Sequence, residues 1–267
     1  MMVLLEDRAV IALSGADARG FLQGLITNDI EHLAPDRPLY AALLTPQGKI
    51  LFDFLISEGD GAVLLDCAAV SRDALVKRLS MYRLRAKVDI AAREQLAVVW
   101  GDLPSVAFDD PRLPELGRRR VMARAEMPGD VLPSDAYLHR RLGLGVPEGA
   151  DFGSDRMFAL DAGLDELQGV SFSKGCYVGQ ELTARMKHRG TARKRLLLIE
   201  SLEGALPETG TGVMAAGHNL GEITVTYGAR GFALVRLDRL DEAGDAPVEA
   251  GGVRVKLVKQ SWLDARA

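Results

Sequence analysis

The chain has 267 residues, of which 48% are hydrophobic and 26% are charged. This composition excludes disordered, collagen-like and coiled-coil proteins, and the length allows one large domain or two to three small ones. The net charge of −4 argues against nucleic-acid binding by bulk electrostatics. The two cysteines, Cys67 and Cys176, lie too far apart in the sequence for a CxxC motif and do not form a disulfide framework.

The amino-terminal residues carry Glu6 and Asp7 inside an apolar stretch, which is unlike the hydrophobic region of a secretory signal. No apolar run approaches the ~20 residues that a membrane-spanning helix needs. We therefore expect a soluble, cytoplasmic protein with no membrane partner.

Residues 1–100 have the pattern of an α+β domain. Strands are predicted at 9–13, 39–44, 50–57, 62–67, 87–91 and 96–100. Apolar residues at helical spacing predict one helix from Asp17 that carries Ala18 to Ile26, and a second helix from Ser71. The irregular alternation of strands and helices indicates an α+β fold.

Residues 101–190 are predicted to form a middle α+β domain. The run Arg118-Arg119-Arg120 is typical of a solvated strand edge, and the alternative is a surface that contacts anions. A short helix is predicted from Ser134 to Leu142. The glycine-rich loop 143–153 matches neither a dinucleotide-binding motif nor a P-loop.

Residues 191–267 alternate apolar with polar residues at 194–200, 222–227, 232–237 and 253–259, with glycine-rich turns between them. This pattern predicts a small antiparallel β-barrel. The chain is thus predicted to contain three small domains, at 1–100, 101–190 and 191–267.

The segment 169–190 contains the most unusual residues of the chain. Val178, Leu182 and Met186 recur at helical spacing and predict a helix with Cys176 in its first turn. Lys174 and the positive end of the helix dipole would then favour the reactive thiolate of Cys176. The alternative is that Cys176 is a small buried hydrophobic residue.

Three further features of the sequence leave alternatives open. Glu181 lies four residues before Arg185, the favourable order for an ion pair within a helix. The cations of residues 185–195 form either a solvated helix end or a site for an anionic ligand or partner. Asp53 and Asp161 follow or interrupt apolar runs, so each is either a satisfied structural carboxylate or a ligand contact.

The histidines His32, His139, His188 and His218 lack metal-ligand spacing. The segment 169–173 lacks the closing glycine of a nucleophile elbow. A zinc enzyme, a serine hydrolase and a P-loop NTPase are therefore poorly supported, and no metal site is predicted.

Residues 174–181 read KGCYVGQE and resemble, at all eight positions, the K-G-C-Y-x-G-Q-E signature of the YgfZ-type folate-binding proteins. These proteins help to assemble or maintain iron–sulfur clusters and are relatives of the glycine cleavage T-protein, an aminomethyltransferase. Further similar blocks are LSGAD at 13–17, FLQG at 21–24, TND at 27–29, TPQGK at 45–49, YRLRAKV at 82–88 and LDAGL at 160–164.

The resemblance implies three small domains in a ring around a central channel that holds tetrahydrofolate. It implies that Cys176 is the functional cysteine, which Lys174 helps to keep ionised. The other motif residues, Tyr177, Gln180 and Glu181, together with Arg185, would line the channel. Asp161 stands at an acidic position that contacts the pterin ring in T-protein relatives, and Asp53 is the second expected folate contact.

The expected function is therefore that of a tetrahydrofolate-binding protein that supports assembly or repair of iron–sulfur clusters, with iron–sulfur enzymes or assembly proteins as partners. One alternative is a tetrahydrofolate-dependent aminomethyltransferase. Phe52 stands where T-protein relatives carry the first of two paired acids, which argues against this activity. A second alternative is an RNA-contacting module involved in tRNA modification, acting through residues 185–195.

Overall fold

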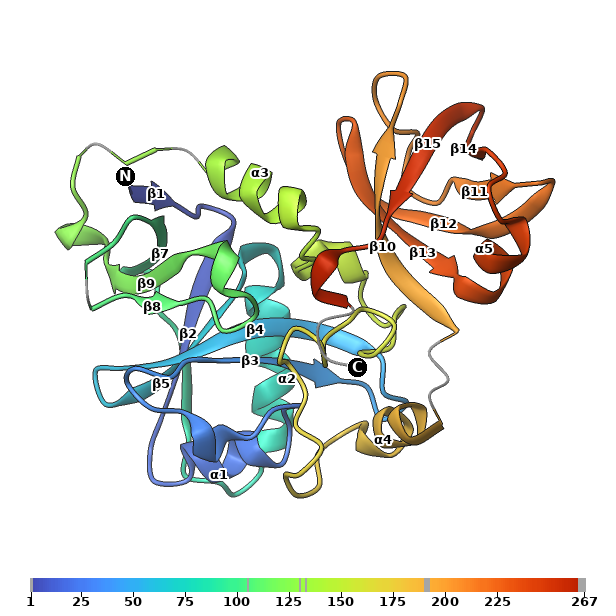
Figure 1. Ribbon diagram of the computed structural model, residues 1–267. Coiled ribbons are helices and arrows are strands. Elements are labelled where there is room, and N and C mark those ends of the chain that lie inside the picture. Colours follow the sequence, from blue (N-terminus) through green and yellow to red (C-terminus); the bar gives the residue numbers. More distant parts are fainter. Residues whose placement is uncertain (1, 105, 130, 133, 190–192, 264–267) are drawn as a thin grey trace.

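The computed structural model describes residues 2–104, 106–129, 131–132, 134–189 and 193–263. It consists of two antiparallel sheets, a closed barrel and a set of short helices (Figure 1). The predicted α+β class and the carboxy-terminal antiparallel barrel are both confirmed.

The first sheet has five strands in the order β3-β4-β5-β2-β6. Its strands are β2 (Arg8–Ser14), β3 (Leu39–Leu44), β4 (Ile50–Gly59), β5 (Ala62–Ala68) and β6 (Asp89–Ala92). All five lie within a few residues of the predicted strands. The helix α2 (Arg72–Arg83) packs against β2 and β6, and its Leu75 and Leu79 are fully buried.

The first helix, α1 (Ala18–Gln23), is shorter than predicted. Ile26 forms a bridge with Leu43 of β3, and the backbone N–H of Thr27 donates to the carbonyl oxygen of Ala42 at 3.0 Å. Because these residues hydrogen-bond to the sheet, the apolar pattern continues beyond the end of the helix.

The second sheet has four strands in the order β1-β7-β9-β8. They are β1 (Met2–Leu4), β7 (Leu96–Gly101), β8 (Phe108–Asp109) and β9 (Arg118–Ala123). The strand β1 and nearly all of β7 come from residues 1–100, whereas β8 and β9 come from residues 101–190, so this sheet takes strands from both sides of the predicted boundary. The helix α3 (Asp135–Leu144) confirms the predicted helix in the middle of the chain.

The interpretation of the arginine run as a solvated strand edge is wrong for Arg119. Strand β9 lies between β7 and β8, and Arg119 is fully buried. Its guanidinium forms ion pairs with Asp66 and Asp110. The hydrophobic pattern cannot show this burial, because the carboxylates that make it possible come from distant parts of the chain.

The barrel closes in the order β10-β13-β12-β11-β14-β15. Its strands are β10 (Lys194–Ser201), β11 (Gly212–Ala215), β12 (His218–Tyr227), β13 (Arg230–Arg236), β14 (Val248–Ala250) and β15 (Val253–Val258), and helix α5 (Leu237–Ala243) follows β13. The four predicted strands are confirmed. The short β11 and β14 complete the barrel but are too brief to show alternation. The predicted domain boundary at 190/191 lies outside the described residues.

Short 3₁₀ helices punctuate the chain at η1 (Ile30–His32), η2 (Ala69–Ser71), η3 (Pro114–Leu116), η4 (Arg124–Glu126), η5 (Gly149–Phe152) and η6 (Ser261–Leu263). Within the described ranges, no helix has the length and apolar character needed to cross a membrane.

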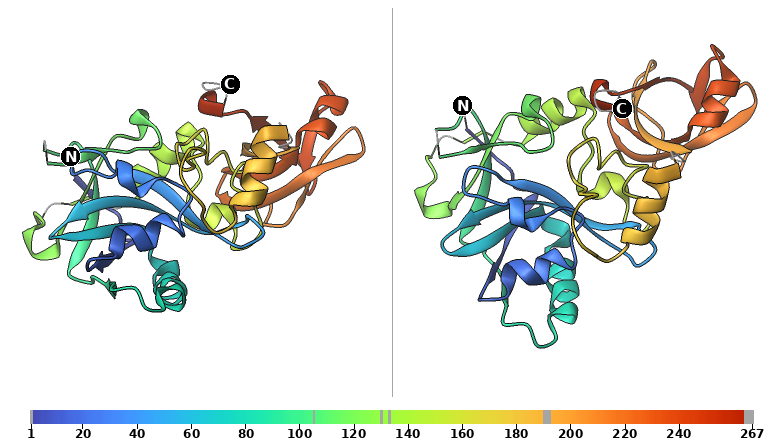
Figure 2. Two further views of the ribbon diagram at one scale, coloured as in Figure 1. Left: turned by 90° about the horizontal axis from the view of Figure 1, so that it is seen from below. Right: turned by 60° about the horizontal axis from the view of Figure 1, so that its bottom comes forward.

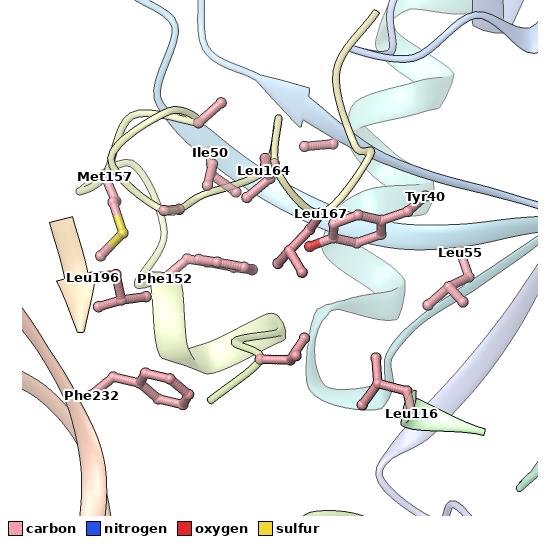
Figure 3. Close-up of a cluster of buried hydrophobic side chains, with 14 of the residues drawn as sticks. Tyr40, Ile50, Leu55, Leu116, Phe152, Met157, Leu164, Leu167, Leu196 and Phe232 are labelled. Carbon is pink, nitrogen blue, oxygen red and sulfur yellow. The ribbon is translucent and has the colours of Figure 1, made fainter. Parts of the chain in front are cut away.

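One hydrophobic core joins the two sheets to the barrel. The first sheet contributes Tyr40 and Leu55, and Leu116 comes from η3, between β8 and β9 of the second sheet. Leu196 and Phe232 come from the barrel. Figure 3 shows these side chains around a shared centre, together with Phe152, Met157 and Leu164 of the connecting segment. Because burial of apolar surface is the main stabilising contribution to folding, this shared core fixes the three parts relative to one another.

Candidate functional site

The KGCYVGQE segment forms a loop that leads into helix α4 (Gln180–Arg189). The helix begins four residues after Cys176, so the prediction that Cys176 lies in its first turn is wrong. Gly179 has φ +83°, and a Cβ on it would lie 2.5 Å from the carbonyl oxygen of Thr45. The close approach to the turn at residues 45–48 requires glycine in this left-handed conformation, and the helix starts directly after it.

Lys174 anchors this loop to the first part of the chain. It is buried, and its Nζ donates to the carbonyl oxygens of Gln23 at 2.8 Å, Ile26 at 2.8 Å and Asn28 at 2.7 Å. An ammonium group has three donors, so none remains for a hydrogen bond to Cys176. Burial lowers the pKa of Lys174 to about 8. In the structure, Lys174 positions the loop. No hydrogen bond from Lys174 supports the prediction that it helps to ionise Cys176, because its three donors bind backbone carbonyls.

The two cysteines differ sharply in their surroundings. Cys176 is an exposed free thiol, whereas Cys67 is a buried one in β5. Burial raises the pKa of Cys67 to about 12. Since the thiolate is the reactive form of cysteine, Cys67 is not available for chemistry near neutral pH, and Cys176 is the cysteine that solvent reaches.

Tyr177 and Gln180 line a small cavity of about 170 Å³ next to the loop, together with Phe172, Lys187 and His188. Two other predicted ligand contacts, Glu181 and Arg185, are exposed and do not line this cavity. Within the described part of the chain, no ion pair between them is found. The predicted contacts are therefore split between a cavity wall and an open helix face.

A larger cavity, of about 560 Å³, lies between the first sheet, the segment around Asp110 and the residues that lead into the loop. Its walls include the partly exposed ring of Phe172 and the polar side chains of Asp165 and Gln168. Phe172 belongs to both cavities. The volume of the larger cavity falls in the range of ~300–1,000 Å³ that is typical of small-molecule sites.

The acidic residues Asp165 and Glu166 form ion pairs with two cations of the basic cluster at residues 185–195. Lys187 Nζ donates to Asp165 Oδ2 at 3.1 Å, and an Nη of Arg195 donates to Glu166 Oε1 at 2.6 Å. Burial and the neighbouring Asp165 raise the pKa of Glu166 to about 7. Lys187 and Arg195 therefore serve internal contacts, while Arg185, Arg193 and Lys194 remain exposed.

Asp53 and Asp161 have different surroundings in the structure. Asp53 accepts hydrogen bonds from the Tyr40 hydroxyl at 3.2 Å and from the Gly149 backbone N–H at 2.9 Å. It lines a cavity of only about 80 Å³, to which Asp161 does not contribute. Asp161 is buried, and burial raises its pKa to about 6. The predicted contact of each residue with folate therefore stays a prediction.

A network of buried ionic side chains at the meeting point of the three parts went unnoticed in the sequence. We call it the buried ion cluster; its members are Arg8, Asp66, Asp110, Arg112, Arg119, Tyr137, Arg141, Glu148 and Asp151. At its centre, Glu148 Oε2 accepts from Arg112 at 2.6 Å and from the Tyr137 hydroxyl at 2.8 Å. Burial acts to raise the pKa of Glu148, but the surrounding arginines hold it well below its usual range.

The sequence contains only a weak indication of the buried ion cluster. Glu148 and Asp151 lie in the glycine-rich loop 143–153, which matches no nucleotide-binding motif. Their side chains form a reciprocal capping box at η5, in which Asp151 accepts from the Glu148 backbone N–H at 2.9 Å. Two carboxylates in an otherwise apolar, glycine-rich loop are the one local hint of buried partners.

The overall fold of this chain is shared with a solved structure. The chain superposes on the crystal structure of the glycine cleavage system aminomethyltransferase T from Bartonella henselae with a TM-score of 0.77, covering 98% of this chain and 85% of that one, at 17% sequence identity. This likeness shows a shared fold. Residues 193–265 match the family model described as the CAF17 C-terminal beta-barrel domain.

Sequence relatives then identify the family. Two are the iron-sulfur cluster assembly factor IBA57, mitochondrial, of Mus musculus and of Homo sapiens, 33% and 34% identical, each alignment covering 88% of this chain and 77% of the relative. A third is the IBA57 homolog of Neurospora crassa, 35% identical over 76% of this chain. The chain belongs to the IBA57 family of iron–sulfur cluster assembly factors.

These relatives refine two predictions. The resemblance to iron–sulfur assembly proteins with a T-protein-like fold is confirmed, and the matched family is IBA57. The prediction of a cytoplasmic location is contradicted, because all three relatives are described as mitochondrial. The chain spans about half of the Neurospora relative, 54% of its length.

Proposed function

We propose that this chain supports the assembly of iron–sulfur clusters in client enzymes, and that Cys176 is the thiol that meets the cluster-carrying partner. The observation that carries the proposal is the exposed Cys176 on a loop that Lys174 and Gly179 hold in place. Iron–sulfur clusters are bound through cysteine thiolates, so an accessible and positioned thiol suits contact with a cluster or with the protein that carries it.

The loop is built to present this thiol in one place. Its first half is fixed by the hydrogen bonds from Lys174 to three backbone carbonyls. Its second half is fixed where Gly179 packs against the turn that contains Thr45 and Gly48. Anchors on both sides of Cys176 reduce the ordering that a partner must impose on binding.

Complementation tests this proposal. In cells that lack their own family member, expression of this chain is expected to restore the activity of iron–sulfur enzymes and leave an enzyme without a cluster unchanged. An empty vector is the control. Normal folding and expression of the chain without any recovery of iron–sulfur enzyme activity would contradict the proposal.

We propose as a second function that the chain binds tetrahydrofolate, in the larger cavity. The cavity volume of about 560 Å³ and the partly exposed Phe172 in its wall support this, because flat heterocycles pack against aromatic rings. Asp165 and Gln168 supply polar groups at the same cavity. The residues inferred from the sequence, Asp53 and Asp161, lie outside it.

Calorimetric titration with tetrahydrofolate tests this second function. Phe172→Ala is expected to weaken binding by about 1–3 kcal/mol, the usual contribution of a stacking ring. Asp53→Asn is the matched control and leaves the affinity unchanged. Absence of binding to the unaltered chain, or an equal loss in both variants, would remove the cavity assignment without affecting the role of Cys176.

A further inference from the structure

The loop 174–179, which carries Cys176, is called the thiol loop. A second surface of the molecule, remote from the thiol loop in the sequence, carries unpaired positive charge. We call it the α2 tip; it comprises residues 77–87, the last turns of α2 and the turn that follows. Its cations are Lys77, Arg78, Arg83, Arg85 and Lys87. Among the described residues, none of these five side chains forms an ion pair or a hydrogen bond. The tip is strongly positive in a chain whose net charge is −4.

Two large apolar side chains are exposed among these cations. Met81 is 63% exposed and Leu84 is 88% exposed. Leu84 also has φ +43°, in the region of backbone conformation that favours glycine, so this leucine is strained. A single exposed leucine needs no explanation, but a strained and almost fully exposed leucine next to an exposed methionine makes an apolar centre with a basic rim.

The tip is held rigidly. The backbone N–H of Lys87 donates to the carboxylate of Asp17 at 2.7 Å. A Cβ on Gly15 would lie 2.3 Å from the carbonyl oxygen of Lys87, so the two backbones touch. Leu79 and Val88 are buried on either side of the exposed turn. The right-hand view of Figure 2 shows this end of α2 protruding on the side away from the barrel.

We propose that the α2 tip docks an acidic segment of a partner protein, with one apolar side chain of that segment packed on Leu84 and Met81. Charge complementarity selects the acidic partner, because five cations without internal partners attract carboxylates and speed the encounter. Methionine and arginine are enriched at the centres of protein interfaces. The inference is independent of the proposed function of Cys176.

A nucleic-acid ligand fits this surface less well. Single-stranded RNA is bound by stacking its bases on exposed aromatic rings. The aromatic residue of the tip, Tyr82, is half-buried and packs against the core of the first sheet. The helix dipole alone accounts for Arg83 in the last turn, but not for Arg85 and Lys87, which lie beyond the helix.

Fluorescence anisotropy on the whole chain tests the proposal with a synthetic acidic peptide that carries leucine at every fourth position. We expect Leu84→Ser to weaken binding about tenfold, and Arg85→Glu to weaken it by a similar factor that shrinks as salt rises. The double variant Leu202→Ser, Lys256→Glu is the matched control, since it changes an exposed leucine and an exposed lysine of the barrel. Cys176→Ser also leaves peptide binding unchanged.

Four results would overturn the proposal. The first is no binding of the acidic peptide to the unaltered chain. The second is equal binding of a peptide with serine in place of leucine, which would reduce the effect to non-specific charge attraction. The third is an equal loss in the barrel control. The fourth is tighter binding of an RNA oligonucleotide of the same charge that Leu84→Ser leaves intact.

Discussion

The buried ion cluster and the thiol loop both contain charged side chains that sequence patterns mark as surface groups, yet the molecule uses them in opposite ways. In the cluster, Arg119 and Arg112 are fully buried and bound to carboxylates from several elements. In the loop, Lys174 is also buried, but it binds only backbone carbonyls and leaves Cys176 exposed a short distance along the chain.

The difference shows how burial separates the structural from the functional charges. Four arginines of the cluster face carboxylates whose combined charge balances theirs, so no charge is left for a ligand. Lys174 instead uses all three of its donors to fix a backbone path, and the exposed Cys176 lies two residues further along the chain. Ionic residues in the interior thus hold the fold together, whereas the thiol proposed to act, Cys176, is on the surface.

The largest expected effect comes from opening the buried ion cluster. Arg119→Ala leaves Asp66, Asp110 and Glu148 without one of their partners, and removing one member of a buried pair costs about 3–5 kcal/mol. Urea denaturation measures the loss in the free energy of unfolding. Arg120→Ala, the next residue on β9, is the control and changes stability by less than about 0.5 kcal/mol. Equal small losses would show that the cluster is not structural.

A smaller effect is expected from Lys174→Met, which leaves the carbonyls of Gln23, Ile26 and Asn28 without their donor. The loss is about 2–3 kcal/mol, in the range for hydrogen bonds to a charged group. Limited proteolysis should also cut the loop at 169–179 faster. Lys187→Met, which removes a half-exposed ion pair with Asp165, should cost less than about 1 kcal/mol. A reversed order of the two variants would contradict the anchoring role of Lys174.

The pH dependence of stability gives a third and smaller effect. Burial raises the pKa of Asp161 from 3.8 to about 6, so the folded state binds this proton more tightly than the unfolded state. The resulting stabilisation is complete below pH 3.8 and is lost as the pH rises through 6.

We therefore expect Asp161→Asn, which cannot ionise, to gain about 1–2 kcal/mol relative to the unaltered chain between acidic and neutral pH. Urea midpoints on both sides of pH 6 measure the difference. Parallel stability curves for the two proteins across this range would show that Asp161 is not desolvated in the folded state.

The spacing of apolar residues predicted most of the strands and helices, because this signal lies within each element's own segment of the chain. Strands β3, β4 and β5 have apolar runs that any pairing would bury. What the sequence could not show depends on contacts between distant segments. The start of α4 is set by the approach of Gly179 to Thr45, and the burial of Arg119 is set by Asp66, fifty-three residues earlier in the chain.

The candidate site divides in the same way. The motif located Cys176 and Lys174, because residue type and order are themselves the signal. The larger cavity draws Tyr40, Asp110 and Phe172 from three separate segments, and no spacing in the sequence links them. Asp53 and Asp161 also come from separate segments, and their shared contact with folate stays a prediction.

The two cysteines are proposed to have different roles, Cys176 as the thiol that acts and Cys67 as a structural residue. The most direct measurement is iron–sulfur enzyme activity in cells lacking their own family member, after expression of Cys176→Ser or Cys67→Ala at matched soluble levels. We predict that Cys176→Ser folds with unchanged stability and restores no activity, whereas Cys67→Ala restores activity in proportion to its folded fraction. Full recovery with Cys176→Ser would contradict the account.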